Sequence, residues 1–428
     1  MPKTVIVTGG GWAGCAAALS AARAGIEVQL FEKTDMLLGA GLVGGIMRNN
    51  GRYTAAEEAL RLGGGGELFA LTDQAARHEN IRFPGHDHAN LYDITLVEPL
   101  VLRHLQDAGV DVHLERRVVD VERGTGGVSA LIDEDGHTHR ADAFVDATGT
   151  SGPMGNCTRY GNGCVMCVQR CPAFGPRVSV AARAGVRELM AIKRPDVPGA
   201  MSGSGKLNKE SLSQDIRNTL NEKGVAVLPL PRDLVQQGKL GTKACQQYAL
   251  PDYADNIVLL DTGHAKLMTP YFPLQELRRI PGLERARFED PYAGGRGNSI
   301  RFTAVAPRDN SLLVDGLSNL FCAGEKAGIY IGHTEAMVTG MLAGHNAARQ
   351  TLALELLELP RSMAIGDFIA SGREAILTRQ GLESSYTFAG SVFFERMQKR
   401  GLYTTDSDVL DRRVEETGLL RGVFSKSL

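Results

Sequence analysis

Residues 4–14 read TVIVTGGGWAG, and this stretch decides the fold. Its opening run, residues 5–7, is short, apolar and β-branched, which is typical of a parallel strand buried on both faces. The glycines that follow have the spacing G-x-G-x-x-G. Gly9 permits a tight turn, Gly11 lets a pyrophosphate approach the backbone, and Gly14 lets a helix pack closely on the strand.

The next segments complete a β-α-β unit. An alanine-rich helix is expected over 15–24, and a second strand over 28–32. The helix N-terminus offers free N–H groups to phosphates. Glu32 ends the second strand, where a carboxylate can accept from ribose hydroxyls. This context favours a dinucleotide-binding site over a glycine-rich turn that binds no nucleotide.

The segment after the acidic residue points to FAD. Residues 36–45 read MLLGAGLVGG, and flavoproteins of the glutathione-reductase type commonly run such a segment beside the ribityl chain and isoalloxazine. By this resemblance, Lys33 and Gly39 are also assigned to the cofactor site. A hydrophobic strand that ends in Ala147, Thr148 and Gly149 returns under the cofactor in the same fold.

Several further elements are expected before that strand. In flavoproteins of this type a valine near 118 often touches the adenine, which makes Val118 a candidate. Pro99 interrupts an otherwise helical pattern, so a kink or a later helix start is expected. The expected elements are a helix over 92–108, strands over 110–114 and 117–122, and a hairpin of 128–132 with 140–145 around Asp135 and Gly136.

A second cofactor-binding segment lies far along the chain. Residues 317–325 read LSNLFCAGE and precede a helix expected over 334–351. Related flavoproteins often have Gly-Asp at this point, with the carboxylate on the ribitol, and this chain has Gly324 and Glu325. Gly332 is expected to bring backbone close to the flavin pyrimidine edge. The FAD domain is therefore expected to be discontinuous.

The motifs resemble a known superfamily. Residues 5–24 look like two-dinucleotide-binding-domain flavoproteins, within the FAD-dependent oxidoreductases that include succinate dehydrogenase-like and heterodisulfide-reductase-like chains. Residues 320–349 and 359–366 also resemble tRNA-uridine-modifying flavoproteins, notably the folate-dependent methyltransferases. The resemblance covers about half of the chain and is specific for the cofactor, not for the substrate.

Four cysteines form a compact motif. Cys157-x6-Cys164-x2-Cys167-x3-Cys171 is followed by a proline, and its end resembles a bacterial ferredoxin cysteine run. The motif predicts a [4Fe–4S] cluster close after Gly149, within reach of the flavin domain. The alternatives are a structural zinc on four thiolates, a redox dithiol of Cys164 with Cys167, and four unrelated cysteines.

Three residues are candidates for catalysis. His333, at the start of the expected helix, is a candidate proton donor or acceptor, and Arg48 and Arg301 are candidates for binding an anionic substrate. The alternative for Arg301 is a surface salt bridge, and the alternative for His333 is a structural role at the start of the helix. The loop around His86 and His88 is expected to be a solvated turn. Two other cysteines, Cys15 and Cys322, are expected to be packing residues.

Composition limits the class of protein and the partners that remain possible. The chain has 428 residues, 43% hydrophobic and 22% charged, with a formal net charge of −2. These values predict a soluble, cytoplasmic protein without a membrane partner, and they make a nucleic-acid partner unlikely but do not exclude it. No second G-x-G-x-x-G unit for NAD(P)H is evident.

The sequence therefore predicts an α/β flavoprotein with a Rossmann-like FAD-binding domain, an inserted cap and a helical C-terminal extension. The expected parts are an FAD domain at 1–155 and 300–351, a cap with the cysteine loop at 156–299, and the extension at 352–428. The predicted function is an FAD-dependent oxidoreductase coupled to an iron–sulfur cluster, with an unidentified small-molecule substrate, a possible redox partner protein and possible homo-oligomerisation. The alternatives are a tRNA-modifying flavoenzyme and an electron-transfer subunit of a larger complex.

Overall fold

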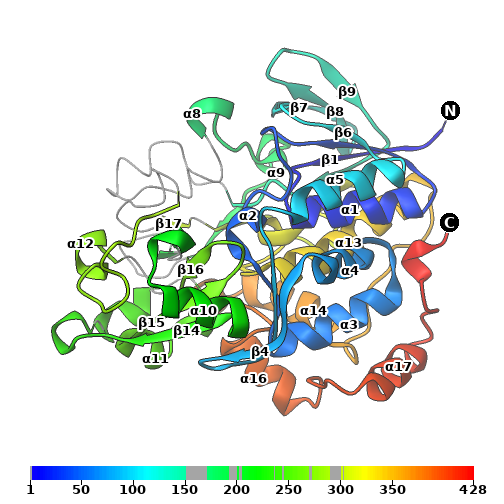
Figure 1. Ribbon diagram of the computed structural model, residues 1–428. Coiled ribbons are helices and arrows are strands. Elements are labelled where there is room, and N and C mark those ends of the chain that lie inside the picture. Colours follow the sequence, from blue (N-terminus) through cyan, green and yellow to red (C-terminus); the bar gives the residue numbers. More distant parts are fainter. Residues whose placement is uncertain are drawn as a thin grey trace.

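The computed structural model in Figure 1 describes residues 2–150, 171–191, 200–201, 205–235, 237–242, 245–268, 272–289, 300–301 and 303–428. The predicted cysteine ligands Cys157, Cys164 and Cys167 lie outside these residues, and so does the side chain of Cys171.

A five-stranded parallel sheet forms the centre of the N-terminal part, in the order β19-β10-β1-β2-β6. Its first strand, β1, is flanked on one side by β2 and on the other by β10, the strand that precedes Thr148. The buried run of residues 5–7 explains why β1 is central, because these three side chains are apolar on both faces of the strand. The strands are β1 (Thr4–Thr8), β2 (Glu27–Phe31), β6 (Asp111–His113), β10 (Ala143–Asp146) and β19 (Leu320–Cys322). This topology confirms the predicted α/β class.

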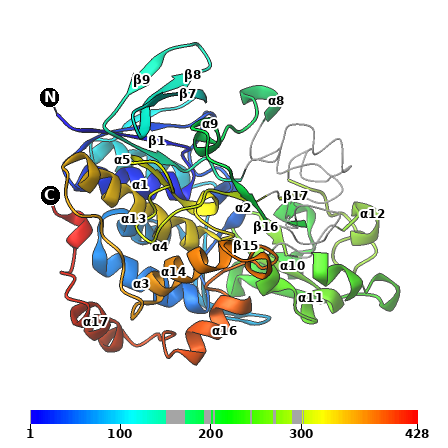
Figure 2. The same cartoon turned by 180° about the vertical axis from the view of Figure 1, so that it is seen from behind.

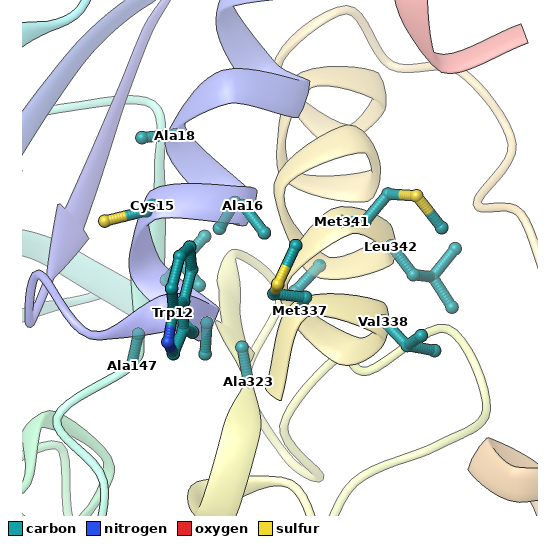
Figure 3. Close-up of a cluster of buried hydrophobic side chains, with 14 of the residues drawn as sticks. Trp12, Cys15, Ala16, Ala18, Ala147, Ala323, Met337, Val338, Met341 and Leu342 are labelled. Atoms are coloured by element: carbon teal, nitrogen blue, oxygen red, sulfur yellow. The ribbon is translucent and has the colours of Figure 1, made fainter. Parts of the chain in front are cut away.

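Two helices distant in sequence pack together beside this sheet. They are α1 (Trp12–Arg23) and α13 (His333–Thr351), and Figure 3 shows Trp12 and Ala16 facing Met337 and Met341 across the contact. The helices approach closely because small residues line the contact. A Cβ at Gly344 would lie 2.0 Å from the backbone oxygen of Ala17. The N-termini of both helices therefore lie beside the same end of the sheet.

Smaller sheets and helices surround this core. A hairpin sheet is formed by β7 (Val118–Gly124), β8 (Gly127–Asp133) and β9 (Thr138–Arg140), and another sheet by β3 (Ile46–Arg48), β5 (His86–Tyr92) and β4 (Ala76–Phe83). The α-helices of the chain between β2 and β6 are α2 (Gly41–Gly44), α3 (Gly51–Leu62), α4 (Leu68–Gln74) and α5 (Val97–Asp107).

The inserted region has a sheet and a core of its own. Strands β13 (Gly205–Leu207), β16 (Ala265–Leu267), β15 (Asn256–Asp261) and β14 (Val225–Pro229) pair antiparallel in that order, and α10 (Gln214–Lys223) packs on β14 and β15. A separate apolar cluster, including Leu207, Leu220 and Leu259, fills the space between them. The shorter elements between residues 171 and 305 are α8 (Cys171–Phe174), α9 (Val180–Arg183), β11 (Leu189–Met190), β12 (Ala200–Met201), α11 (Asp252–Asp255), α12 (Leu274–Leu277), β17 (Ile300–Arg301) and β18 (Ala304–Val305).

The C-terminal extension is helical, as predicted, and wraps back over the first domain (Figure 2). It comprises α14 (Ala364–Ile376), α15 (Arg379–Leu382), α16 (Ser391–Lys399) and α17 (Ser407–Glu416). The buried carboxylate of Glu58 in α3 accepts hydrogen bonds from the backbone N–H groups of Ala364 and Ile365, which satisfies the free donors at the start of α14.

Two expectations about local structure are wrong, and one is confirmed. The helix expected over 92–108 starts later, at Val97, as Pro99 led us to expect, because proline fits the first turn of a helix but not its interior. Tyr92 is the last residue of β5, and His86 is a buried strand residue rather than part of a solvated turn. The expected strand 140–145 is split, since β9 ends at Arg140 and β10 begins a separate sheet.

None of the helices in the described part of the chain has the length and apolar character needed to cross a lipid bilayer.

Candidate flavin-binding site

The glycine turn leaves the start of α1 open. Gly11 is the N-cap residue, no side chain of the described residues caps the helix there, and its first turn contains no acidic residue. A Cβ at Gly11 would meet no atom of the described residues within 4 Å, whereas a Cβ at Gly14 would lie 1.8 Å from the Gly9 oxygen. The turn is thus tight on its inner side and open on its outer side, where backbone N–H groups can bind phosphate.

Glu32 connects the glycine turn to the end of β2. Its Oε2 accepts from the Gly10 backbone at 2.8 Å, and its Oε1 accepts from the Thr34 backbone at 2.9 Å and from the Thr34 hydroxyl at 3.0 Å. A carboxylate has about four acceptor positions, so capacity remains for a ribose hydroxyl. The position fits the predicted ribose contact, which stays a prediction.

The two other predicted cofactor segments lie side by side. Strand β10 pairs with β19, and the backbone N–H of Ala323 donates to Asp146 at 3.0 Å. The hydroxyl of Thr150, just after Gly149, donates to Glu325 Oε2 at 2.5 Å. The sheet therefore joins the turn at 147–149 to the turn at Gly324 and Glu325, although Thr150 and Glu325 are 175 residues apart in the sequence.

A buried donor in this region meets no acceptor at hydrogen-bonding geometry in the described part of the chain. Trp12 is 2% exposed, and its indole Nε1 has no hydrogen-bond partner among the described residues. Buried donors are rarely left without an acceptor. The open start of α1 and this indole N–H are features that a bound dinucleotide would satisfy.

Tyr92 connects Trp12 to His333. The Tyr92 ring stands edge-on to Trp12, with ring centroids 6.0 Å apart, and its hydroxyl donates to the Gly41 carbonyl oxygen at 2.8 Å. The same hydroxyl lies 3.2 Å from His333 Nδ1. Nδ1 is therefore the ring nitrogen of His333 that faces Tyr92.

His333 is the first residue of α13, directly after Gly332, whose φ is +143°. No side chain of the described residues caps this helix start either. The predicted catalytic histidine and the predicted pyrimidine-side glycine therefore lie together at the N-terminus of α13, beside α2.

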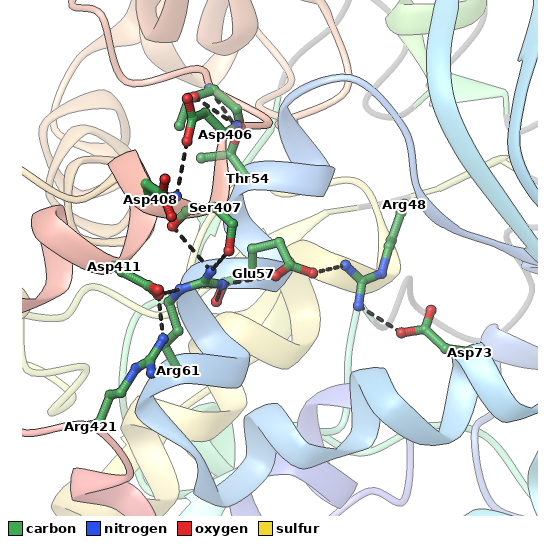
Figure 4. Close-up of polar contacts among 11 residues, drawn as sticks. Arg48, Thr54, Glu57, Arg61, Asp73, Asp406, Ser407, Asp408, Asp411 and Arg421 are labelled. Carbon is green, nitrogen blue, oxygen red and sulfur yellow. Dashed lines mark hydrogen bonds and ion pairs between the residues drawn. The ribbon is translucent and has the colours of Figure 1, made fainter.

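Other predicted residues have structural partners. Arg48 is buried and pairs with Glu57 and, at 2.7 Å, with Asp73, as Figure 4 shows. Lys33 Nζ donates to the Gly175 carbonyl oxygen at 3.0 Å. Val118 begins β7 and is 5% exposed, and Gly39 lies in the segment before α2. Arg301 lies in β17, and its side chain is outside the described residues.

Cys15 and Cys322 are packing residues by position. Both are fully buried, and burial raises the pKa of the Cys322 thiol to about 12 and that of Cys15 further above its ordinary value. Neither thiol is a nucleophile at neutral pH in this state.

Sequence reasoning missed three residues of the site: Trp12, Tyr92 and Lys266. Trp12 occupies a variable position of the glycine motif, and Tyr92 was placed in the expected helix. Lys266 comes from the insert, and its Nζ donates to the Val43 carbonyl oxygen at 2.6 Å. Nothing in the local sequence indicates that a lysine of the insert reaches the flavin segment.

The fold and these features define an FAD-binding flavoprotein. The chain belongs to the family described as Glucose inhibited division protein A, whose profile matches residues 4–248 and 261–355.

Curated relatives and a solved structure agree with this family. The chain is 32% identical over 129 residues to the tRNA uridine 5-carboxymethylaminomethyl modification enzyme MnmG of Metamycoplasma arthritidis, covering 28% of this chain and 20% of that one. It is 38% identical over 96 residues to the methylenetetrahydrofolate–tRNA-(uracil-5-)-methyltransferase TrmFO of Symbiobacterium thermophilum, covering 22% of this chain and 20% of the relative. The structure of Aquifex aeolicus GidA superposes with a TM-score of 0.65 at 17% identity, covering 96% of this chain and 76% of that one.

The sequence matches are partial. They span about a fifth of the length of these two curated relatives. The similarity to the Aquifex structure, at 17% identity, shows a shared fold.

Proposed function

We propose that this chain is an FAD-dependent enzyme that modifies a uridine base in tRNA. The observation that carries the proposal is the site between α1 and α13, with its open helix start at Gly11 and the donor of Trp12, in a chain of this family. Of the curated relatives named above, one is named for modifying tRNA uridine and the other as a tRNA-(uracil-5-)-methyltransferase.

The residues of the chain have separate tasks in this proposal. Gly11 and the start of α1 hold the pyrophosphate, Glu32 holds the ribose, and Glu325 holds the ribitol. Bound FAD supplies two-electron redox chemistry that side chains lack. Nδ1 of His333 contacts Tyr92, and we assign proton exchange with the substrate to the opposite nitrogen, Nε2.

Arg48 and Arg301 remain the predicted contacts to an anionic group of the substrate. Arg48 already pairs with Glu57 and Asp73, so a substrate anion would have to compete with two carboxylates. The side chain of Arg301 is outside the described residues, so its role stays a prediction from the sequence.

A tRNA substrate changes the expectation about partners. The net charge of −2 gives no overall attraction to nucleic acid. The net charge of the whole chain, however, does not describe the charge of the surface beside the site. Membership in this family is a reason to expect a tRNA-binding surface beside the site, in spite of the net charge of the whole chain. Binding of unmodified tRNA should then weaken steeply as salt rises from about 50 to about 200 mM.

The test is the binding of tRNA by the FAD-loaded chain, followed by nucleoside analysis of the tRNA after the reaction with a reductant and a one-carbon donor. A new modified uridine supports the proposal. Salt-independent binding together with unchanged nucleosides would contradict it.

A second candidate function is iron–sulfur-coupled electron transfer, which the cysteine spacing favours. Three of the four cysteines and the side chain of the fourth lie outside the described residues, so the spacing alone carries this candidate. Metal analysis of anaerobically purified protein tests this candidate: about four irons per chain support a [4Fe–4S] cluster, and zinc or no metal contradicts it.

A further inference from the structure

The turn that leads into α13 is bonded to the C-terminal extension. Residues 386–389, which follow α15, lie beside this turn. The backbone N–H of Ile331 donates to the Tyr386 carbonyl oxygen at 3.1 Å, and the N–H of Tyr386 donates to the Ile329 carbonyl oxygen at 2.9 Å. His333, the candidate for proton exchange, comes two residues after Ile331. The extension is therefore in contact with the backbone directly before the candidate histidine.

A buried ion pair contacts the same turn. Arg52 of α3 donates from Nε to Glu335 Oε1 at 3.0 Å and from Nη2 to the Ile331 carbonyl oxygen at 3.0 Å. Between these contacts lies Gly332, where a Cβ would be 2.0 Å from Arg52 Nη2 and 2.0 Å from Glu335 Oε2. Its φ of +143° is a conformation that favours glycine. The residue directly before His333 is therefore enclosed by the two charged groups.

The Thr387 hydroxyl connects the extension to both members of this pair. It donates to Glu335 Oε1 at 2.7 Å, and it accepts from Arg52 Nη2 and from the Ala389 backbone N–H, each at 3.1 Å. One donated and two accepted hydrogen bonds use the full capacity of a hydroxyl group. The Phe388 backbone N–H donates to the same Glu335 oxygen at 2.8 Å. Because Thr387 is fully buried, removal of its hydroxyl would leave buried polar groups without this partner.

The ring of His333 has little freedom to move without losing its contacts. A Cβ at Gly44 would lie 1.5 Å from this ring, and the ring Nδ1 lies 3.2 Å from the Tyr92 hydroxyl. A shift of the preceding turn would therefore press the ring against Gly44 or separate it from Tyr92. Displacement of a reacting group by about 1 Å can lower a rate about a hundredfold.

We propose that Thr387 is a positioning residue for His333. Its hydroxyl orients Arg52 and Glu335, and these two side chains hold the turn at 331–332 in the position that places the His333 ring. The C-terminal extension thereby contributes to catalysis through the start of α13. The inference rests on the proposed function only for the role of His333 in proton exchange, because the position of the ring can be measured without tRNA.

The experiment compares the full chain of wild type with T387V, T387S and a matched control, T54V. T387V keeps the shape of the side chain but lacks the hydroxyl, whereas T387S keeps the hydroxyl. Thr54 is also fully buried and also joins α3 to the extension, since its hydroxyl donates to the Thr404 carbonyl oxygen at 2.6 Å. It lies two residues from Arg52 on the helix, and residues at that spacing do not face each other.

Two quantities are measured on protein whose folding is verified by circular dichroism. The first is kcat and KM of the FAD-loaded chain for the conversion of tRNA. The second is the nuclear magnetic resonance signal of the His333 ring in protein labelled with ¹⁵N-histidine, recorded with and without FAD. The loss of this signal in H333Q assigns it.

We expect T387V to lower kcat at least about tenfold with KM within about twofold of wild type, because the misplaced group acts in the chemical step. The His333 ring signal should shift or broaden in the same variant. T387S and T54V should keep the wild-type signal and a kcat within about twofold of wild type.

A wild-type kcat or an unchanged His333 signal in folded T387V would overturn the inference and leave the proposed function intact. An equal loss in T387S would also overturn it, since the methyl group and not the hydroxyl would then be responsible. The same holds for an equal loss in T54V. If T387V does not fold, T387A, which also lacks the hydroxyl, is judged by the same outcomes. If wild type converts no tRNA, the proposed function fails, and the His333 signal of T387V alone decides the inference.

Discussion

Arg52 of α3 and Glu335 of α13 form an ion pair of 3.0 Å that is almost completely removed from solvent, at 3% and 0% side-chain exposure. Arg52 also donates to the Ile331 carbonyl oxygen at 3.0 Å, and Glu335 accepts from the Phe388 backbone at 2.8 Å. Burial works to lower the pKa of Arg52, but Glu335 outweighs it and holds this pKa above its ordinary value. The pair joins the flavin segment before His333 to the C-terminal extension.

Breaking this pair on one side should be costly. We expect R52M and E335Q each to lower the free energy of unfolding by about 3–5 kcal/mol, because the remaining buried partner loses its compensation. Urea denaturation measures this loss. The exposed pair of Arg379 and Glu383, at 79% and 47% exposure, is the control, and R379Q should change stability by less than about 0.5 kcal/mol. Equal effects at both pairs would contradict the structure.

Two variants of the glycine turn should affect folding and cofactor binding separately. G11A should fold normally, because a Cβ there meets open space, yet it should weaken FAD binding at least tenfold by standing where the pyrophosphate approaches. G14A should reduce stability itself, since its Cβ would lie 1.8 Å from the Gly9 oxygen. Thermal unfolding of the apoprotein and FAD titration distinguish the two. An unchanged FAD affinity in G11A would contradict the site.

His345 should make stability depend on pH. It is fully buried in α13, neither ring nitrogen has a partner among the described residues, and its ring packs on Phe424 at 4.4 Å between centroids. Burial, with a smaller effect of Arg349, lowers the pKa of His345 to about 4 from an ordinary value of 6.5. Below about pH 6.5 the unfolded chain therefore binds a proton that the folded chain does not.

This contribution to stability is present above pH 6.5 and is lost as pH falls towards 4, by about 3 kcal/mol in total. We expect H345F, which keeps the ring against Phe424, to remove that part of the pH dependence. Unfolding free energies at pH 7, 6, 5 and 4.5 test it. Parallel pH curves for H345F and wild type would contradict the assignment.

The fold of the N-terminal part was largely predictable from the sequence, because its elements depend on features that lie close together in the chain. The glycine turn, the buried run at 5–7 and Glu32 are consecutive features whose physics needs no distant partner, so β1, α1 and β2 were located within a few residues. Resemblance to known flavoproteins assigned both segments to the FAD domain, but the pairing of β10 with β19 was not predicted, because no local signal connects segments that far apart.

The residues that complete the site were less predictable. Tyr92 lies at a strand end that helical periodicity concealed, and its partner His333 is about 240 residues away. Lys266 belongs to another sheet, and its role depends on where the insert docks. Arg48 shows the converse: its residue type suggested a substrate contact, but Glu57 and Asp73 already pair with it.

His333 should affect chemistry without affecting cofactor binding. We expect H333Q to retain FAD and to lower the rate of substrate conversion by about 10²–10⁴-fold, the usual contribution of a positioned proton donor or acceptor. Y92F should have a smaller effect, because it removes only the partner of Nδ1. Rates under saturating substrate measure both. Full activity in H333Q would remove His333 from the catalytic residues.

The cysteine motif predicts site-specific metal loss. C164S and C167S should lower the bound iron severalfold, while C15S and C322S, at fully buried packing positions, should leave the iron content of folded protein unchanged. Metal analysis with electron paramagnetic resonance after dithionite reduction provides the readout. Equal iron in all four variants would contradict a cluster held by these cysteines.

The central claim is that the FAD site serves the modification of a tRNA uridine. The most direct test is mass spectrometry of tRNA nucleosides from cells that lack this chain, and from the same cells that carry either wild type or H333Q. We predict that one modified uridine disappears without the chain, returns with wild type and does not return with H333Q. Identical nucleosides in all the strains would contradict the claim and favour the iron–sulfur-coupled electron-transfer function.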